Sequence, residues 1–510
     1  MTTWLRKWFV SSPPLMVEDK NILEKEVVTS NIEQNEAFVK QMFLGCSDLV
    51  CHNIYEVDGK VQRLIVYLET LTGEKKLSEL VLKPYKRSAE ESETWDSESI
   101  PVVKSVTSSN WADIVKLMLR GYAIVFTAGE ASAVCIPVNN LVHRSIEEPS
   151  SEPVIRGPKE GFIERQSVNV GLLRNYIRTP RLKTEAFTVG EITETSVLVT
   201  YIEGLADESV VNQVRDKIAS IQIDGVLESG YIQEMMRQDN PFPLFPTFQV
   251  TERPDVVAGG LLEGRVAILV DNTPFVLVVP VTFWTGMQAS EDYYLSYPIA
   301  TFVRWIRFIF LFIVVFAPSF FVAVTTYHQE MIPTSLLLSI ASAREPVPLP
   351  IMIEVLLMEI MFEALREAGL RLPRTIGQTV SIVGVLVIGQ AAVQAGIISA
   401  PTVIVVSTTG IAAFVIPRFN FANGIRLLRF PIIFLAGSLG LYGIALGFLG
   451  ILLHVVHLKS FGVPYFTPVA PFSIRALKDA WLRFPRKNGV GLSAPTYESA
   501  TKAQQREGGE

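Results

Sequence analysis

The sequence predicts a soluble α+β region followed by an all-α, multi-pass membrane region. Of its 510 residues, 49% are hydrophobic and 19% are charged, which is too apolar for an ordinary soluble enzyme and too charged for a protein made only of membrane helices. The chain reads as water-soluble up to about Val270, whereas apolar runs dominate from Phe302 to Leu458. A pattern that occurs twice in the soluble region is the second observation behind this prediction.

The first residues, 1–30, are expected to form a flexible segment or one that lies on a membrane surface. They contain basic and aromatic residues but lack the apolar core of about seven residues that a secretory signal needs. The three cysteines, Cys46, Cys51 and Cys135, cannot all pair, and no Cys/His spacing resembles a zinc site. A cytosolic, reducing location is therefore the simplest interpretation for the soluble region.

Two stretches of the soluble region share one pattern. GYAIVFTAGEASAVCIPV begins at Gly121 and GRVAILVDNTPFVLVVPV begins at Gly264, and both are typical of β-hairpins. Each follows a segment of helical apolar spacing that ends at the hairpin's glycine. We predict two tandem copies of one α+β unit, at 31–142 and 156–281, joined by a linker at 143–155. Chance similarity between two hairpins is the alternative.

Neither copy carries a catalytic constellation. There is no Gly-rich phosphate loop after a strand, no GxSxG and no HExxH, and His52 and His143 have no Cys or Asp partner at a useful spacing. The formal net charge of −6 averages two unlike regions, and no basic stripe alternates with aromatic residues. We expect no enzyme activity, no cofactor, no metal site and no nucleic-acid partner.

One short motif, ERPD, opens the helix of the second copy. Pro254 stands at an early helical position, where its missing N–H is harmless, and Asp255 is favourable to the helix dipole. We therefore interpret Glu252, Arg253, Pro254 and Asp255 as a structural motif, with ligand binding as the alternative.

The membrane region, 298–458, contains apolar candidates at 302–325, 350–365, 379–398, 402–416 and 431–456. A helix needs about 20 residues to cross the hydrocarbon core, so the first, third and fifth qualify, whereas the fourth is short. The positive-inside rule leaves four or five spans open. A basic amphipathic segment and a disordered cytosolic tail are expected at 459–510.

Carboxylates make the second candidate doubtful as a span. Glu354, Glu359 and Glu363 would each cost a few kcal/mol at mid-bilayer. We expect these carboxylates to meet water or to pair with nearby arginines, namely Arg366, Arg371 or Arg374. The preceding AREPVPLP stretch should fix where this helix begins through Pro346, Pro348 and Pro350. It is either a rigid coupling to a partner or simply a loop.

The fifth candidate contains glycines at a spacing of three or four, which would place them on one helix face and allow close helix packing. They are Gly437, Gly440, Gly443, Gly447 and Gly450. Glycines scattered without consequence are the alternative.

The third candidate contains two amide side chains that cost free energy in hydrocarbon unless they find a partner or water. One broad helix face would present Val383, Leu386, Gln390, Val393, Gln394 and Ile397. In one interpretation this face lines a pore with Leu386 as an apolar gate that closes by dewetting. In the other, Gln390 and Gln394 hydrogen-bond to neighbouring helices, at about 0.6 kcal/mol each. The residues alone leave both open.

Several long motifs resemble the A subunits of GerA-type spore germinant receptors. They are PLFPTFQVTERPDVVAGGLLEGRVAILVDNTPFVLVVPVTFW at 243–284, EDYYLSYP at 291–298, AREPVPLP at 343–350 and ALREAGLRLPRTIGQTVSIVGVLVIGQAAVQAGIISAP at 364–401. The resemblance is specific from about Arg181 to Pro471. The family usually has glycine after the aspartate of the second hairpin turn, where this chain has Asn272. Asparagine also tolerates positive φ, so we expect the turn to survive.

The resemblance implies a component of the endospore inner membrane whose soluble region faces the cytosol or spore core. It implies a permease-like B subunit that binds the nutrient, a lipoprotein C subunit, and self-association into a homo-oligomer that conducts monovalent cations. It also favours the pore interpretation of the glutamine face. One alternative is a relative resembling the stage V sporulation AF protein, a channel subunit that amplifies germination. A solute-binding receptor or transporter without its own pore is another, and a membrane-anchored scaffold explains the glutamines least.

Overall fold

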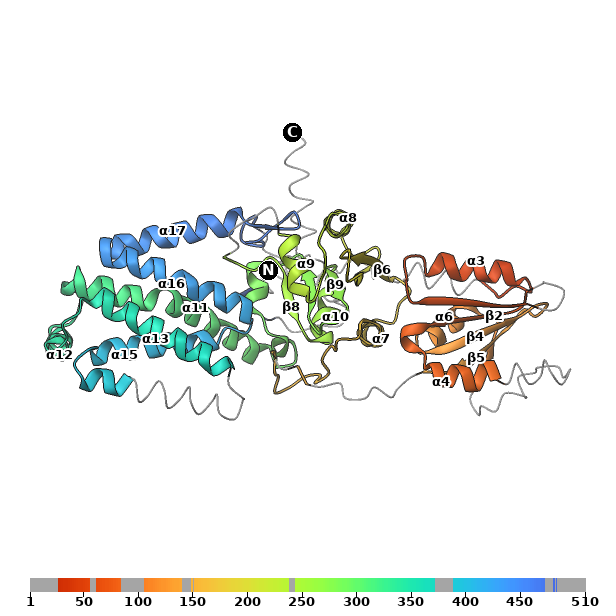
Figure 1. The fold of residues 1–510 in the computed structure, drawn as a ribbon, viewed down its shortest axis with the longest axis horizontal. Coiled ribbons are helices and arrows are strands. Elements are labelled where there is room, and N and C mark those ends of the chain that lie inside the picture. Colours follow the sequence, from red (N-terminus) through yellow and green to blue (C-terminus); the bar gives the residue numbers. More distant parts are fainter. Residues whose placement is uncertain are drawn as a thin grey trace, which may run out of the picture. The chain divides into compact units, whose positions relative to one another are not determined.

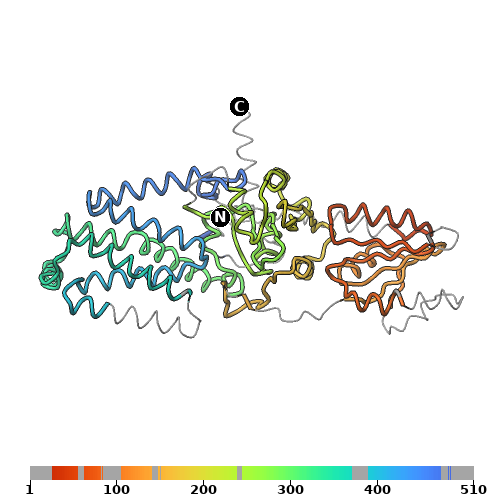
Figure 2. The backbone as a smooth tube through the Cα atoms, viewed as in Figure 1, coloured from red at the N-terminus to blue at the C-terminus, as the bar shows by residue number. Residues whose placement is uncertain are grey.

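The chain folds into two units in a computed structural model that describes residues 26–55, 61–83, 105–139, 148–149, 151–237, 244–371, 389–472, 480–481 and 483. The N-terminal unit lies within residues 26–280, and the C-terminal unit comprises 244–247 and the described residues from 281 onward (Figures 1 and 2). Most of the predicted N-terminal segment, part of the linker and most of the tail lie outside the described residues.

The N-terminal unit begins with a first subdomain built around a five-stranded antiparallel sheet in the order β1-β2-β4-β5-β3. Its strands are β1 (Leu49–Tyr55), β2 (Val61–Leu68), β3 (Val106–Ser108), β4 (Tyr122–Thr127) and β5 (Ala133–Pro137). Its helices are α3 (Ile32–Met42), the 3-10 helix η2 (Glu69–Leu71), α4 (Glu74–Leu77), the π-helix η3 (Ser78–Leu82) and α6 (Trp111–Met118).

The second subdomain contains another five-stranded antiparallel sheet, in the order β6-β7-β9-β10-β8. Its strands are β6 (Leu182–Val189), β7 (Thr195–Ile202), β8 (Gln249–Thr251), β9 (Val266–Val270) and β10 (Val276–Val279). Its helices are α7 (Gln166–Tyr176), α8 (Glu208–Ala219), α9 (Ser229–Met235) and α10 (Pro254–Leu262). Numbered in chain order within each subdomain, the two sheets have the same strand order.

Local sequence signals explain where the predicted helices and hairpins begin and end. The Asn110 side chain accepts a hydrogen bond from the Ala112 N–H at 2.8 Å and caps α6, and Pro254 opens α10. Gly121 and Gly264 follow these helices with φ of +83° and +81°, a conformation that favours glycine. The predicted hairpins are β4–β5 and β9–β10, and Asn272 has the expected positive φ, at +65°.

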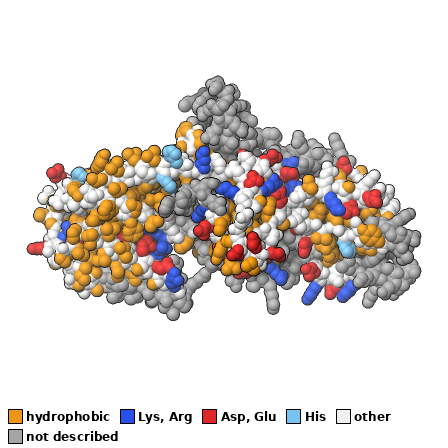
Figure 3. All heavy atoms as spheres, turned by 45° about the horizontal axis from the view of Figure 1, so that its top comes forward, with side chains coloured by type: hydrophobic (Ala, Val, Ile, Leu, Met, Phe, Trp, Pro, Cys, Tyr) orange, Lys and Arg blue, Asp and Glu red, His pale blue; other side chains and the backbone are white. Residues whose placement is uncertain are grey.

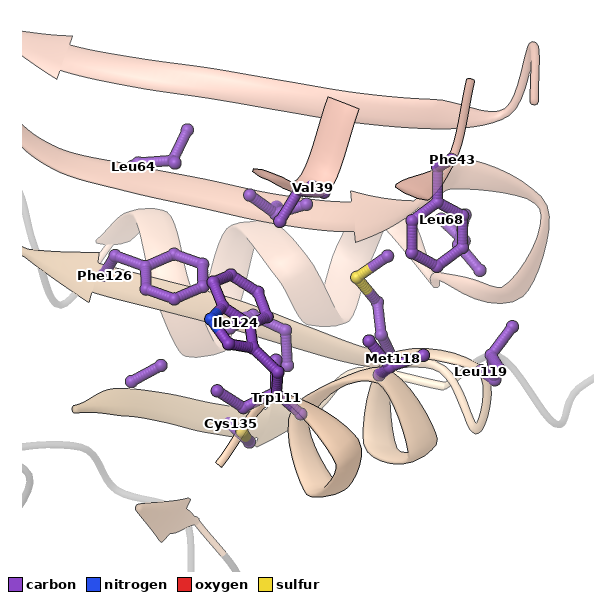
Figure 4. Packing of buried hydrophobic residues seen from close by; sticks show 14 of the residues in the cluster. Val39, Phe43, Leu64, Leu68, Trp111, Met118, Leu119, Ile124, Phe126 and Cys135 are labelled. Atoms are coloured by element: carbon purple, nitrogen blue, oxygen red, sulfur yellow. The ribbon is translucent and has the colours of Figure 1, made fainter. Parts of the chain in front are cut away.

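The core of the first subdomain lies on the face of the sheet that α3 and α6 cover (Figure 4). Val39 of α3 and Phe43 directly after it pack with Trp111 and Met118 of α6 and with Leu64 on β2. Strand alternation directs the neighbouring residues to the opposite face, where a second cluster includes Leu77 of α4 and Val81 of η3. In the second subdomain, α7 and α10 cover the equivalent face.

The two subdomains meet at a buried ion pair. The Arg174 Nε and Nη2 atoms of α7 each lie 2.6 Å from an oxygen of Asp48, which precedes β1. The Arg174 side chain has no exposed surface and that of Asp48 is 5% exposed. Backbone hydrogen bonds join Thr184 of β6 to the carbonyl of Gly45 and the N–H of Ser47. These contacts join the two sheets into one unit.

The C-terminal unit is mainly helical, and its long helices run alongside one another (Figure 1). Its elements are η4 (Phe283–Met287), η5 (Ser290–Tyr293), α11 (Tyr297–Thr326), η6 (Gln329–Met331), α12 (Thr334–Arg344), α13 (Ile351–Arg371), α15 (Ala400–Phe414), α16 (Phe419–Leu439), α17 (Leu441–His457), β11 (Lys459–Ser460) and β12 (Val463–Pro464). Among the described residues, α11 and α16 are long and apolar enough to cross a membrane, and α15 and α17 are shorter apolar helices. Hydrophobic side chains cover much of the visible face of these helices (Figure 3).

The predicted single helix at 431–456 is wrong. Gly440 has φ +63° and ψ −142°, which ends α16 at Leu439 and lets α17 begin at Leu441. The sequence showed regular glycine spacing, but the backbone uses one of those glycines to turn. The glycines therefore belong to two helices and the turn between them, rather than to one helix face.

Candidate functional site

The carboxylates of α13 form a largely buried polar group in the C-terminal unit. The side chains of Glu354 and Glu359 have no exposed surface, and that of Glu363 is 23% exposed. The Glu354 Oε1 accepts hydrogen bonds at 2.5 Å from both the N–H and the hydroxyl of Ser399, just before α15. Its Oε2 lies 3.6 Å from the Arg344 Nε at the end of α12. Glu354 therefore joins three helices.

Glu359 and Glu363 meet arginines from α16. The Arg429 Nη1 lies 2.8 Å from Glu359 Oε2, and its Nη2 lies 2.8 Å from Glu363 Oε1. Glu363 also pairs with Arg366 at 2.9 Å and with Arg426 at 3.6 Å, while the Thr409 hydroxyl of α15 donates to Glu359 at 3.3 Å. Each buried carboxylate of the group thus has a cation or donor within reach.

The structure shows the predicted pairing of Glu363 with Arg366, but Arg371 pairs with Glu367 instead. Arg374 lies outside the described residues. The partners of Glu354 and Glu359 come from other helices, so inspection of neighbouring sequence positions missed them. Arginines three residues apart inside an apolar helix, as at 426 and 429, were the signal that could have found them, because such charges require a partner.

A second buried charge group, also missed from the sequence, lies at the start of α11. Asp292 of η5 is fully buried, and its Oδ2 lies 3.2 Å from Arg304 Nε and 2.7 Å from Arg307 Nη1. The two arginines are again three residues apart on one helix. The two ion pairs of Asp292 hold η5 against α11.

The predicted pore face is described only in part. Residues 389–394 are helical, and Gln390 and Gln394 are both exposed in the single chain. Val393 is half-buried and Ile397 is 46% exposed. Val383 and Leu386, the predicted gate region, lie outside the described residues. The pore face therefore stays a prediction.

The predicted coupling loop connects α12 to α13. Pro346 and Pro348 lie between the end of α12 at Arg344 and the start of α13 at Ile351. The Pro350 carbonyl accepts the Glu354 N–H at 3.0 Å, which is the first hydrogen bond of α13. These prolines therefore precede the helix that carries the buried carboxylates, and Pro350 stands directly at its start.

The ERPD motif is buried inside the second subdomain. Arg253 has no exposed surface, and its guanidinium donates to Asp255 at 2.8 and 3.0 Å and to the carbonyls of Glu152 and Pro158. The Glu252 carbonyl accepts the Phe162 N–H at 2.7 Å. These bonds support the structural interpretation, because the motif's polar groups hold the preceding segment in place.

The remaining predicted glycines differ in their surroundings. A Cβ at Gly437 would collide with Met352 of α13, and one at Gly443 would collide with the Leu435 carbonyl of α16. A Cβ at Gly447 would lie 3.3 Å from Ile432, whereas one at Gly450 would meet nothing within 4 Å. Close helix packing therefore depends on Gly437 and Gly443.

Over the described residues, no group of three or more His, Cys, Asp or Glu side chains is placed to hold a metal ion.

Comparison with known proteins shows similarity over most of the chain. The sequence profile described as Bacillus/Clostridium GerA spore germination protein matches residues 37–489. The uncharacterized membrane protein YfkQ of Bacillus subtilis (strain 168) is 46% identical over 90% of this chain and 90% of its own length. Spore germination protein KA of the same strain is 42% identical over 91% of this chain and 86% of its own.

Comparison with solved structures also gives matches, one of which is informative about coverage. It is the crystal structure of the N-terminal domain of the A subunit of the Bacillus megaterium spore germinant receptor GerK3, with 29% identity. The match covers 51% of this chain and 98% of that one, with a TM-score of 0.40.

Proposed function

This chain belongs to the GerA family of spore germination proteins, and from that premise we propose that it is the A subunit of a nutrient germinant receptor in the spore inner membrane. The observation that carries the proposal is the match of the family profile to residues 37–489, which spans both units. In this proposal the chain acts with a permease-like B subunit and a lipoprotein C subunit.

The membrane part of the proposal is a multi-pass C-terminal unit with the N-terminal unit in the cytosol or spore core. Two helices, α11 and α16, have the length and composition of spans. The carboxylates that made the α13 segment doubtful pair with arginines such as Arg429 and Arg344, which lowers the cost of placing this helix among the others. We further propose that the two subdomains are tandem copies, which their identical strand orders support.

Self-association into a cation channel is the finer part of the proposal. The carboxylates of Glu354 and Glu359 already have partners within one chain, namely Ser399 and Arg429. They are therefore poor candidates for the conducting path. The side chains of Gln390 and Gln394 are exposed instead and make no hydrogen bond to the described part of the chain. Amides on an apolar segment need water or another chain, which favours an axis shared by several copies. A transporter with repeated membrane halves is disfavoured, because the matching sheets lie in the N-terminal unit.

The test uses the assembled complex, purified and reconstituted in vesicles, with cation flux measured without any nutrient. We expect Leu386→Ala to leak because a smaller gate residue makes the dewetted closed state less favourable. Adding Gln390→Leu to that variant should reduce the leak, because it removes a polar group from the conducting path. This design does not require knowledge of the nutrient.

Ile411→Ala is the matched control, because Ile411 is 65% exposed on α15 and should leave flux unchanged. The size of each complex is measured in parallel. A chain that stays monomeric when purified with its partners, or a Leu386→Ala complex as tight as the parent, would remove this helix from the pore. Reduced assembly of the Leu386→Ala/Gln390→Leu double variant, with an undiminished leak through each assembled complex, would support the alternative that the glutamines only join helices.

A further inference from the structure

An apolar cavity of about 350 Å³ lies between α11, α16 and α17 in the C-terminal unit. Side chains of Val315 on α11, Leu428 on α16 and Val455 on α17 line it from three sides. An aromatic wall closes one side and comprises Phe283, Trp284, Phe308, Phe466 and Trp481. The volume falls within the range of about 300–1,000 Å³ typical of sites for small molecules.

The aromatic wall is held by ring-to-ring contacts. The Trp284 and Phe466 rings stack with centroids 5.7 Å apart, and the Phe308 and Trp481 rings stack at 5.3 Å. Trp284 and Trp481 are 5.9 Å apart. Such pairs add about 0.5–1.5 kcal/mol each beyond the burial of their surface, so the wall is formed before anything enters the cavity.

The chemistry of the lining disfavours water and an extended peptide as occupants. Each lining side chain is Phe, Trp, Ile, Leu or Val, whereas a buried water needs two to four polar partners. A peptide backbone would bury N–H and C=O groups without partners. An empty cavity forfeits dispersion contacts with its own walls, and an engineered apolar cavity of about 150 Å³ binds benzene. Hydrocarbon is therefore the occupant that fits.

The cavity is reachable from the outer surface of the helices. Ile309 and Phe312 of α11 and Phe448 of α17 line it, and they are 60%, 55% and 42% exposed. In the membrane placement proposed above, these side chains meet the acyl chains of the bilayer. The surrounding lipid is thus the nearest source of hydrocarbon.

A cationic group marks the Trp481 end of the cavity. Arg304 and Arg307 lie one turn or less before Phe308 on α11, and Arg483 follows Trp481 with its guanidinium carbon 4.8 Å from the centre of the Tyr293 ring. With Asp292, which both α11 arginines bind, these residues carry three positive charges and one negative charge. Tryptophan and arginine together are typical of a membrane–water interface, where a lipid headgroup lies.

We propose that this cavity binds one acyl chain of an anionic phospholipid, whose headgroup lies at the Arg483 end. The inference rests on the proposed membrane placement but not on channel activity. It assigns the cavity a defined ligand class and predicts that one lipid is held more specifically than the lipid that surrounds the helices.

The test uses the full-length protein in bilayers that contain phosphatidylglycerol with a diazirine on its acyl chain. After irradiation, the labelled residues are mapped by peptide mass spectrometry. We expect label on lining residues such as Phe312, Phe448 and Val455, and loss of that label when excess unlabelled phosphatidylglycerol is added. A Val315→Trp variant, which fills the cavity, should lose the same label, whereas Ile411→Trp, on the exposed face of α15, should keep it.

Three outcomes would overturn the proposal. Label spread evenly over exposed positions such as Phe302 and Ile404, with no effect of the competitor, would mean that only surrounding lipid was captured. Absence of label on the lining in the folded parent protein would mean that another part of this chain or a partner fills the cavity. If unlabelled phosphatidylcholine competed as well as phosphatidylglycerol, the site would have no preference for an anionic headgroup. This test measures crosslinking, whereas the test of the channel measures cation flux. Failure of the lipid site can therefore be distinguished from failure of the channel.

Discussion

Glu359 of α13 and Arg429 of α16 form an ion pair at 2.8 Å in which neither side chain has exposed surface. Removing one partner leaves an uncompensated buried charge, so Arg429→Met should lower the free energy of unfolding by about 3–5 kcal/mol. The double variant Glu359→Gln/Arg429→Met should recover much of this loss, because it buries neither charge of the pair. Thermal unfolding of the purified protein in detergent measures both effects.

Arg371→Met is the matched control, since the Arg371 side chain is 79% exposed in its pair with Glu367 and surface pairs contribute little. A double variant no more stable than Arg429→Met would contradict the assignment.

Asp48 and Arg174 make the second prediction, because their pair joins the two subdomains. Arg174→Met should leave the buried Asp48 carboxylate without its partner and weaken the contact between the sheets. We expect it to lower the free energy of unfolding by about 3–5 kcal/mol. Limited proteolysis of the full chain should then cut the N-terminal unit faster. Lys40→Met removes a pair with Glu36 whose lysine side chain is 60% exposed, and it should leave the rate unchanged. Equal rates in all three proteins would show that the pair is dispensable.

The turn at Gly440 makes the third prediction. Its φ of +63° and ψ of −142° lie near a region that is almost restricted to glycine, where other residues cost about 1–3 kcal/mol. A Cβ there would also lie 3.2 Å from the Tyr327 Cβ. Gly440→Ala should therefore lower the unfolding temperature in detergent. Gly450→Ala, which would meet nothing within 4 Å, should match or exceed the parent, and an equal effect of both changes would refute the account.

Glu185 makes a prediction about pH. Burial alone would raise the pKa of its carboxyl, but hydrogen bonds from Arg215 and Tyr201 and the charge of Arg215 outweigh it, so the pKa lies below the ordinary value of 4.5. A lowered folded-state pKa adds stability above the unfolded-state pKa, and this contribution is lost as the pH falls through the folded-state pKa. Glu185→Gln should therefore be less stable than the parent at pH 7.

The stability difference between Glu185→Gln and the parent should shrink as the pH is lowered through 4.5 and below. Urea unfolding followed at several pH values measures it. A difference that is constant with pH would assign the effect of the substitution to packing instead.

The AREPVPLP loop makes the fifth prediction. Pro348→Ser and Pro350→Ser free the backbone just before α13, the helix whose carboxylates are held by α15 and α16. We expect both variants to assemble normally but to change how readily nutrient triggers germination, measured as a dose response of spores at equal protein level. Unchanged responses in both would leave these residues as an ordinary loop.

The sequence predicted local features well because short-range rules determine them. The hairpins at Gly121 and Gly264, the helix start at Pro254 and the turn at Asn272 all follow from residues that lie next to one another. The pairings of Glu359 with Arg429 and of Asp48 with Arg174 join residues far apart in the chain, and no local spacing encodes them. The error at 431–456 has a related cause, since regular glycine spacing is compatible with both a helix face and a turn.

The order of α13 and α16 along the chain has a consequence for biosynthesis. An arginine at mid-bilayer costs about 2.5–3.5 kcal/mol during insertion, and α16 carries both Arg426 and Arg429. The ribosome completes α13 first, so Glu359 and Glu363 are already made when these arginines arrive. On the proposed membrane placement, we expect α16 to insert poorly on its own and to be retained in the bilayer by the earlier helix, which makes the two helices a single unit of insertion.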